Sequence, residues 1–349
     1  MGLATPEMGS KALVVCVTTI GDLLLATPLI QALYDVLGRK VDVLTNRSSA
    51  PVLKGNPNVE FVYIWEDVCG KDIAGEKWCN IMEYVNIYSV RSPASLVAKL
   101  ASCEGRWHFV PNPFYEEVKF FDRALRFFSH RYRRRVHREL HIVERMLSMV
   151  GLERKDIGKY RLQMCGEVLP DWIFDKLEYL ELPIVGLHLA GSQQIRKLRP
   201  EILIELVQSF PANWVLIGGP AESKVADRIM SMVSGPIDVT GRLNLNQCYS
   251  LIERLDICVA PDSLIMHMAA AACVPLVALM GNELEELYGP YKGSKHNRVI
   301  HRHAECSPCK LKECRKFDGY SCVQDINAKE IAGSLSEIWN GILEDRRNS

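Results

Sequence analysis

The feature that most constrains this fold is a regular alternation of short apolar segments with longer segments of helical period. The alternation runs through the first half of the chain and starts again in the second half. Neighbouring parallel strands need a crossover of a dozen or more residues between them, and that crossover is usually a helix. The pattern therefore predicts an α/β protein, and a length of 349 residues predicts two domains. We expect two Rossmann-like, doubly wound domains that face a cleft.

The expected elements follow this alternation in order. In the first half, strands are predicted at 12–18, 41–45, 61–65, 84–90 and 107–110, and helices at 22–37, 93–102 and within 115–150. In the second half, strands are predicted at 184–189, 214–218, 237–240, 257–260 and 276–280, and helices at 171–180, 200–210, 221–233, 244–254 and 263–273. We place the first domain at 1–168, the second at 169–326, and at 327–349 a C-terminal helix that packs back toward the first domain.

Charge and cysteine content narrow the class of protein. Lys and Arg number 42, as do Asp and Glu, so the whole chain has no net field to attract nucleic acid. Eight of the 12 cysteines are isolated in the sequence, which is typical of a reducing compartment. The first apolar stretch is short and lacks a preceding basic region, unlike a secretory signal. We expect a soluble, cytoplasmic protein.

A glycine and a carboxylate follow the first predicted strand. In an open α/β sheet, ligands bind outside the carboxyl ends of the strands. Here that loop contains Gly21, and Asp22 stands at the start of the next helix. Asp is a preferred residue at a helix start, so a capping role is one interpretation. A general base is the other.

Two loops of the second half combine small and cationic residues. The loop at 191–200 contains Ser192 and Lys197 just before a proline that begins a helix. This combination suits a phosphate group, although a solvated basic loop has the same composition. Gly218 and Gly219 follow the next strand, which alone is a weak signal.

A further loop places a carboxylate and a hydroxyl before a helix of small residues. Asp262 and Ser263 precede the alanine run at 269–272, which lets a helix lie close to a sheet. The backbone N–H groups at such a helix start favour an anion. A single histidine is more often structural, but His267 lies one helical turn after Ser263, on the face of the predicted anion site.

The same motifs, taken in order, resemble those of a known enzyme family. They are Gly21-Asp22 followed by Leu-Leu-Leu-Ala-Thr-Pro28, the segment 41–45, His141-Ile-Val-Glu-Arg145 leading to Gly151-Leu152, the loop 197–200, Gly218-Gly219-Pro220, Asp238-Val-Thr-Gly241, and Asp262-Ser263 with His267. Together they resemble glycosyltransferase family 9, the ADP-heptose heptosyltransferases of lipopolysaccharide core synthesis. The resemblance runs from about residue 11 to residue 340.

This resemblance implies a GT-B fold and an inverting transfer that requires no metal cofactor. The first domain would bind the acceptor, a lipopolysaccharide-type glycan, and the second would bind the nucleotide sugar, ADP-heptose. Asp22 falls on the family's presumed catalytic base. Lys197 falls where the leaving diphosphate needs positive charge. The residues expected to bind the donor are Ser192, Lys197, Gly218, Gly219, Asp262, Ser263 and His267.

Several residues depart from the family pattern. Thr19 stands where the family often has Arg, and Arg199 stands where a Trp often precedes the proline. Leu264 replaces a common Gly, and Gly281-Asn282-Glu283 replaces a frequent Gly-Pro-Thr. These positions touch the donor pocket, so the sugar and the base stay open. Two alternatives also stay open, namely an autotransporter-type protein glycosyltransferase and a non-catalytic, metal-holding scaffold.

A basic zone lies in the acceptor half. Residues 119–145 include nine Lys or Arg, among them Arg131, Arg133, Arg134 and Arg135. A solvated helix face is one interpretation. The other is a site for an acidic glycan or protein acceptor, with peripheral contact to an anionic inner membrane.

Four cysteines are concentrated near the C-terminus. Cys306, Cys309, Cys314 and Cys322 follow the spacing C-x2-C-x4-C-x7-C. Four thiolates at such spacing predict a structural Zn or Fe site, because four protein ligands leave no open position for catalysis. Reduced thiols in a loop are the alternative. The resemblance adds that some relatives that glycosylate proteins have an iron-holding cysteine cluster.

Overall fold

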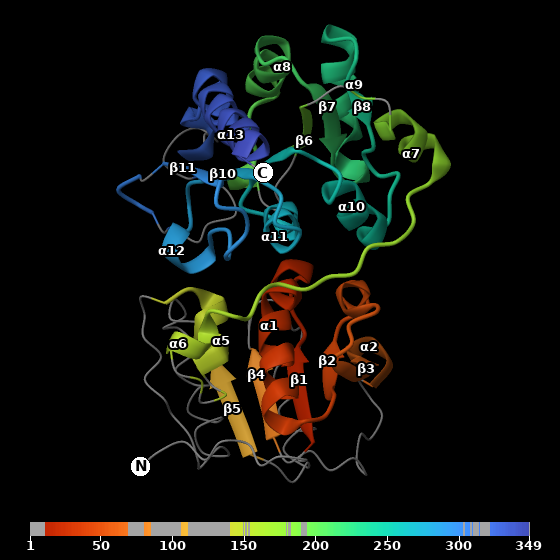
Figure 1. Ribbon diagram of the computed structural model, residues 1–349, viewed down its shortest axis with the longest axis vertical. Coiled ribbons are helices and arrows are strands. Elements are labelled where there is room, and N and C mark those ends of the chain that lie inside the picture. Colours follow the sequence, from red (N-terminus) through yellow and green to blue (C-terminus); the bar gives the residue numbers. More distant parts are fainter. Residues whose placement is uncertain are drawn as a thin grey trace. The chain divides into compact units, whose positions relative to one another are not determined.

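Parallel strands form two separate sheets in the computed structural model, one in each of the units into which the chain divides, Met1–Met164 and Cys165–Ser349 (Figure 1). The structure describes residues 11–68, 80–84, 106–110, 140–148, 150, 152, 154–178, 180, 183–189, 194–302, 304–307, 309, 314 and 322–348. The boundary between the units lies slightly before the one predicted from the sequence.

The sheet of the first unit has five strands in the order β3-β2-β1-β4-β5, and every pair is parallel. The strands are β1 (Ala12–Cys16), β2 (Val41–Thr45), β3 (Val59–Ile64), β4 (Asn80–Tyr84) and β5 (Arg106–Val110). The strand order reverses between β1 and β4, which is where ligands bind in doubly wound sheets. This strand begins before the predicted range 84–90, because residues 80–83 already pair with β1 and residues 80–84 with β5, and residues 85–90 lie outside the described residues.

The longest described helix of the first unit is α1 (Ile20–Leu37), and it begins at the carboxyl end of β1. Gly38 ends the helix in the left-handed conformation, with φ of 68°, which favours glycine. Its mean hydropathy of 1.4 over 18 residues is sufficient, by length and composition only, for a membrane-crossing helix. However, 61% of that stretch is buried within the protein, and α1 packs on β1, β2 and α5 (Ile142–Ser148).

The remaining described helices of the first unit are short. They are η1 (Ala50–Leu53), α2 (Trp65–Val68) and α6 (Arg154–Ile157). The helix predicted at 93–102 and most of the one predicted within 115–150 lie outside the described residues.

The sheet of the second unit has six parallel strands in the order β11-β10-β9-β6-β7-β8. They are β6 (Ile184–His188), β7 (Asn213–Ile217), β8 (Ile237–Asp238), β9 (Ile257–Pro261), β10 (Leu276–Met280) and β11 (Arg298–His301). The order reverses between β6 and β9. Both sheets therefore have the predicted doubly wound topology.

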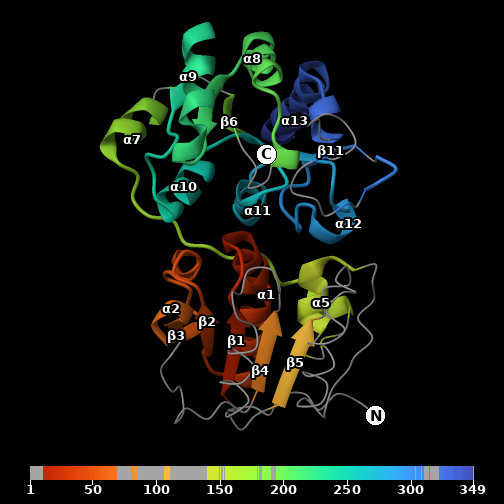
Figure 2. The same ribbon diagram turned by 180° about the vertical axis from the view of Figure 1, so that it is seen from behind.

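The helices of the second unit lie around this sheet (Figures 1 and 2). They are α7 (Asp171–Glu178), η3 (Gln194–Arg196), α8 (Pro200–Ser209), η4 (Pro220–Glu222), α9 (Ser223–Met232), α10 (Leu245–Ile252), α11 (Leu264–Ala271), α12 (Glu285–Tyr288), η5 (Cys322–Asp325) and α13 (Ala328–Asn348). Helix α8 packs against α9 and α13, and α11 packs against α10, β9 and β10. Alternate strand residues such as Leu187, Val259 and Leu279 form one core with α8, α9 and α13.

Helix α13 packs within the second unit. Residues 327–349 were predicted to pack back toward the first unit, and the structure shows Ile331, Leu335 and Ile338 buried in the core of the second unit. The reason is their spacing, which forms an apolar stripe along one side of the helix that fits the face of the sheet.

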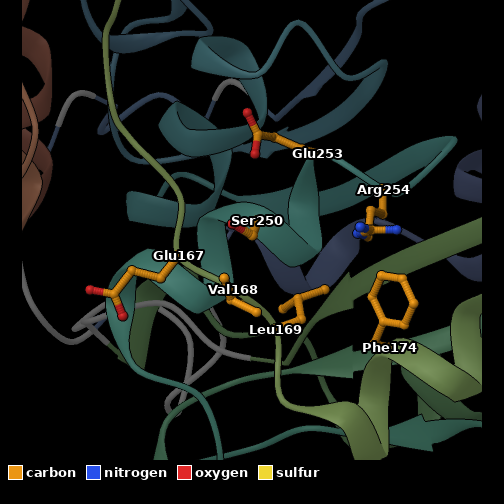
Figure 3. Close-up of a pocket in the computed structure, with 7 residues that line it drawn as sticks. All are labelled: Glu167, Val168, Leu169, Phe174, Ser250, Glu253 and Arg254. Carbon is orange, nitrogen blue, oxygen red and sulfur yellow. The ribbon is translucent and has the colours of Figure 1, made fainter.

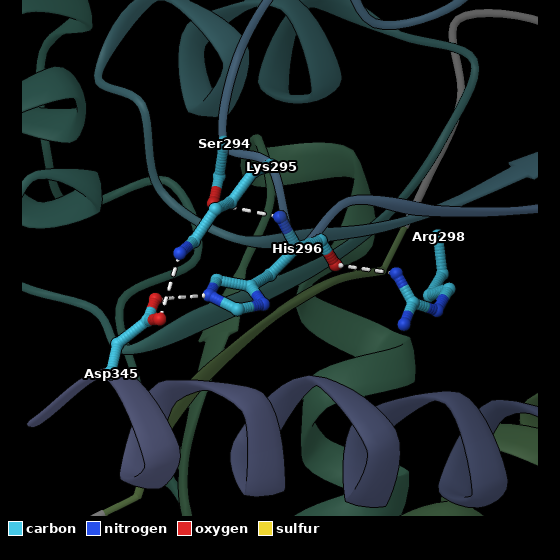
Figure 4. Close-up of polar contacts among 5 residues, drawn as sticks. All are labelled: Ser294, Lys295, His296, Arg298 and Asp345. Carbon is cyan, nitrogen blue, oxygen red and sulfur yellow. Dashed lines mark hydrogen bonds and ion pairs between the residues drawn. The ribbon is translucent and has the colours of Figure 1, made fainter. Parts of the chain in front are cut away.

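Polar contacts hold the end of α13 to the same unit (Figure 4). The Asp345 carboxylate contacts Lys295 Nζ and His296 Nε2, both at 2.7 Å. A side chain at Gly341 would have its Cβ 2.7 Å from His296 Nδ1, so glycine lets the imidazole lie against the helix. Hydrogen bonds from Lys295 and His296 lower the pKa of Asp345.

Candidate functional site

Two loops meet where the strand order of the second sheet reverses. His188 is the last residue of β6, and Ser263 follows the end of the neighbouring strand β9. Ser263 Oγ lies 3.1 Å from His188 Nδ1, which joins the two strand ends. The predicted turn at 262–263 therefore lies at the switch point of this sheet.

A buried ion-pair cluster occupies this switch point. Arg196 lies in η3 and its guanidinium is 3.1 Å from Asp262 Oδ2, 3.2 Å from the Asp262 carbonyl oxygen, and 3.3 Å from Glu283 Oε1. Asp262 is only 5% exposed, and burial raises the pKa of its carboxyl while Arg196 opposes the rise. From the sequence, Lys197 was the cation of this basic loop predicted to bind the donor, and Arg196 was not singled out. The order of cations along a loop does not reveal which of them turns toward a buried carboxylate.

Lys197 makes a weaker contact on a neighbouring loop. Its Nζ lies 3.6 Å from Glu222 Oε1, and its side chain is 36% exposed. The other Glu222 oxygen accepts a hydrogen bond from the Gly219 N–H at 3.0 Å. Gly218 permits this arrangement, because a Cβ there would lie 2.9 Å from Glu222 Cβ. Glu222 was not predicted from the sequence, because a capping box is recognised by a hydroxyl or short polar side chain three residues before the acid, and Gly219 has none.

Both histidines at the site are neutral at physiological pH. Burial lowers the pKa of His188 to about 3. Burial and the nearby Arg196 lower the pKa of His267 to about 4. The Nδ1 atom of His267 is buried and has no hydrogen-bond partner within the described part of the chain. These rings can donate or accept hydrogen bonds, but positive charge for an anionic ligand must come from Arg196 and Lys197.

In the first unit, Asp22 lies at the start of α1, beside the point where the strand order reverses. Its Oδ2 accepts hydrogen bonds from Thr19 Oγ1 at 2.9 Å and from the Thr19 N–H at 3.3 Å. The Asp22 N–H donates in return to Thr19 Oγ1 at 3.3 Å. This is a complete capping box, so Asp22 does cap the helix. The side chain stays partly exposed.

Several predicted site residues lie outside the described part of the chain. They are Ser192, Arg131, Arg133, Arg134 and Arg135. At the end of the basic zone, Arg145 is buried rather than solvated, and its Nε donates to the Leu140 carbonyl oxygen at 2.9 Å.

The four clustered cysteines are free and partly buried. Among the residues that the structure describes, no three His, Cys, Asp or Glu side chains are gathered closely enough to hold a metal. Burial raises the pKa of the Cys322 thiol, and the nearby thiols of Cys309 and Cys306 raise it further. Cys306, Cys309 and Cys322 therefore lie close enough to interact electrostatically.

A separate hollow of about 370 Å³ opens beside α10 (Figure 3). The residues that line it are Glu167, Val168, Leu169, Phe174, Ser250, Glu253 and Arg254. Burial raises the pKa of Glu253, and the guanidinium of Arg254 lies 4.7 Å from the centre of the Phe174 ring. None of the predicted donor-binding residues lines this hollow.

Two doubly wound parallel sheets, one in each unit, are the architecture of the GT-B fold class. The family described as Glycosyltransferase family 9 (heptosyltransferase) matches residues 119–318, more than half of the sequence. The chain belongs to this family, as the motifs indicated, and it is a glycosyltransferase.

Solved structures show the same fold. A family 9 glycosyltransferase from Veillonella parvula is 17% identical, with a TM-score of 0.74 over 96% of this chain and 98% of that one. The ADP-heptose lipopolysaccharide heptosyltransferase II of E. coli is 18% identical, with a TM-score of 0.69 over 96% and 99%. The iron-containing dodecameric glycosyltransferase TibC of enterotoxigenic E. coli is 12% identical, with a TM-score of 0.59 over 97% and 81%. No curated protein matches the sequence.

Proposed function

We propose that this glycosyltransferase transfers heptose from ADP-heptose, with inversion at the anomeric carbon, to a lipopolysaccharide-type glycan. The observation that carries the proposal is the cluster at the switch point of the second sheet, where Arg196 is held by Asp262 and Glu283. A nucleoside diphosphate leaving group gains negative charge as its bond breaks, and fixed cations stabilise that charge. Arg196 and the more exposed Lys197 supply such cations without a metal.

The neutral side chains of the cluster suit the uncharged part of the donor. Ser263 and His267 offer hydroxyl and imidazole groups for hydrogen bonds to hydroxyl groups of a nucleotide sugar. Gly218 leaves room for Glu222, which holds the Gly219 loop beside Lys197. The family description and the donor named for the E. coli heptosyltransferase favour ADP-heptose over other nucleotide sugars.

Asp22 is the proposed general base. It removes the proton from the acceptor hydroxyl as that oxygen attacks the anomeric carbon of the sugar. The bond from this carbon to the diphosphate oxygen then breaks on the opposite face, which inverts the configuration. The capping box orients the carboxylate for this step through Thr19.

The positive charge of the basic zone is the basis for the proposed acceptor. The basic zone at 119–145 suits an acidic glycan at the cytoplasmic surface of the inner membrane. A protein acceptor is the second candidate, because this chain has a cysteine cluster and the similar TibC is an iron-containing glycosyltransferase.

A panel of nucleotide sugars tests the donor. ADP-heptose is expected to raise the unfolding midpoint by mass action, whereas UDP-glucose and GDP-mannose are expected to change it little. Release of ADP that depends on an acidic core glycan would then establish transfer. A shift with every sugar tested except ADP-heptose would contradict the proposal.

We further propose a structural Zn or Fe bound by Cys306, Cys309, Cys314 and Cys322. The spacing C-x2-C-x4-C-x7-C of these cysteines supports the proposal. The segment between them is polar, so metal ligation would supply stability that apolar burial does not.

Elemental analysis of the purified protein is expected to find about one Zn or Fe per chain. Cys306→Ser is expected to lower the unfolding midpoint or the resistance to protease more than it lowers the transfer rate, since the ion holds the segment and does not react. Cys273→Ser is the control, because Cys273 is an exposed cysteine outside the cluster. A metal-free preparation with full stability would leave the four cysteines as ordinary thiols.

A further inference from the structure

Asn282 carries a buried amide without a hydrogen-bond partner. It follows β10 by two residues and is 1% exposed. Neither its Nδ2 nor its Oδ1 has a hydrogen-bond partner within the described part of the chain. A buried amide that is left unpaired destabilises the folded protein, and such groups are uncommon in native structures. This amide therefore points to a partner that arrives with a ligand.

The backbone around Asn282 is fixed on both sides. The Gly281 carbonyl oxygen accepts a hydrogen bond from Ser307 Oγ at 2.7 Å. A Cβ at Gly281 would lie 2.6 Å from Cys322 Sγ, so the cysteine segment packs tightly against this position. On the other side, Glu283 is held by Arg196 at 3.3 Å. Both neighbours of Asn282 are thus held in place.

Asn282 also belongs to the proposed donor site. The register of β9 and β10 pairs Pro261 with Leu279, so the residues that follow both strands leave the sheet side by side. Arg196 contacts Asp262 after β9 and Glu283 after β10, which joins these two loops. The amide is therefore next to the residues that we propose to bind the nucleotide sugar.

We propose that Asn282 binds a hydroxyl-bearing part of the nucleotide sugar and contributes to the choice of donor. An amide offers one acceptor and two donors, and a hydroxyl group can satisfy both kinds of atom. A diphosphate offers only acceptors and would leave Oδ1 unpaired. The hydroxyl belongs either to the ribose or to the transferred sugar.

The inference rests on the proposed function and adds to it. In the family pattern a proline often stands at this position, and a proline side chain has no group that can donate or accept a hydrogen bond. Asn282 is thus a residue by which this chain can recognise its donor differently from relatives with the Gly-Pro-Thr sequence. A site built to pair with a hydroxyl rejects ligands that lack it, because its buried polar group is then left unpaired.

The test compares Asn282→Leu with Asn246→Leu by calorimetric titration with ADP and ADP-heptose. Asn246 is a matched control, because it is 3% exposed and its Nδ2 donates to the Cys165 carbonyl oxygen at 2.8 Å. Asn282→Leu is expected to weaken ADP-heptose binding at least ten-fold while the unfolding midpoint stays the same or rises. Asn246→Leu is expected to lower the midpoint and leave both dissociation constants unchanged. Asn282→Ala repeats the test with a smaller side chain if leucine prevents folding.

The ADP arm identifies the source of the hydroxyl group. Equal weakening of ADP and ADP-heptose places it on the ribose, and weakening of ADP-heptose alone places it on the transferred sugar. A wild-type protein that binds both ligands, with Asn282 variants that bind them equally well, overturns the inference alone. A wild-type protein that binds neither ligand overturns the proposed donor and the inference with it.

Discussion

Asp22→Asn is expected to lower the rate of sugar transfer by about 10²- to 10⁴-fold, the scale of a lost general base. Asparagine retains an oxygen that accepts the hydrogen bonds from Thr19, so the start of α1 stays capped. The unfolding midpoint and the affinity for ADP are therefore expected to change little. Steady-state transfer kinetics and calorimetric titration with ADP measure the two effects separately.

A second capping box in the protein supplies the control for Asp22. Gln247 occupies the same helical position in α10, where its Oε1 accepts from the Asn244 N–H at 3.1 Å. Gln247→Ala is expected to lower stability and leave transfer unchanged, because it removes only a cap. If Asp22→Asn behaved in the same way, Asp22 would be a helix cap and not the base.

Arg196→Met is expected to destabilise the second unit by about 3 kcal/mol, because it leaves Asp262 as a buried carboxylate without its cation. In a unit of this size, that corresponds to a fall of roughly 6–12 °C in the unfolding midpoint. We expect the low end of the range for broken buried pairs, since the Arg196 side chain is still 15% exposed. Differential scanning calorimetry of the two proteins measures the loss.

Arg228→Met is the matched control for a lost ion pair. Arg228 lies 2.7 Å from Glu201, but both side chains are more than half exposed. Its loss is expected to cost less than about 1 kcal/mol, because solvent screens exposed charges. Equal losses in the two variants would show that the Arg196 pair contributes no more than a surface pair.

The loss of unfolding free energy in Arg196→Met is expected to depend on pH, because the Asp262 carboxyl titrates. Burial raises the pKa of this carboxyl above its ordinary value of 3.8, so the folded protein holds the proton more tightly than the unfolded chain does. The contribution of such a group to the stability of the folded protein falls as pH rises from that ordinary value through the folded pKa. Without Arg196 the folded pKa rises further, so the deficit is expected to be smaller at pH 5 than at pH 7.5. A deficit that grew on acidification would contradict this role of Asp262.

Local sequence signals were sufficient to predict those elements whose structure depends on residues close together in the chain. The helix from Asp22 to Leu37 was predicted within two residues of its start, because Thr19 and Asp22 form a capping box and Gly38 ends the helix. The predicted Asp262 turn lies at a switch point, because a polar residue that directly follows a strand must lie at the edge of the sheet.

Contacts between side chains of different loops could not be predicted from local sequence signals. Lys197 and Arg196 are adjacent in sequence, yet Arg196 reaches the buried carboxylate and Lys197 reaches Glu222. Which of two neighbouring cations turns inward depends on the short helix η3 and on what packs against it. Asn282 was noticed in the sequence only as a departure from the family pattern, since its burial depends on a segment 25 to 40 residues later.

The sequence by itself determined that the chain forms two doubly wound α/β units and belongs to glycosyltransferase family 9. Hydrophobic periodicity and helix caps depend on residues that are close in the sequence, and the order of motifs is a property of the sequence itself. These signals can therefore be recognised without a structure. Only the tertiary structure decided that α13 packs on the second sheet, that Arg196 joins Asp262 to Glu283, and that the amide of Asn282 is buried without a partner. These facts depend on the burial and pairing of groups far apart in the chain, and no local pattern encodes them.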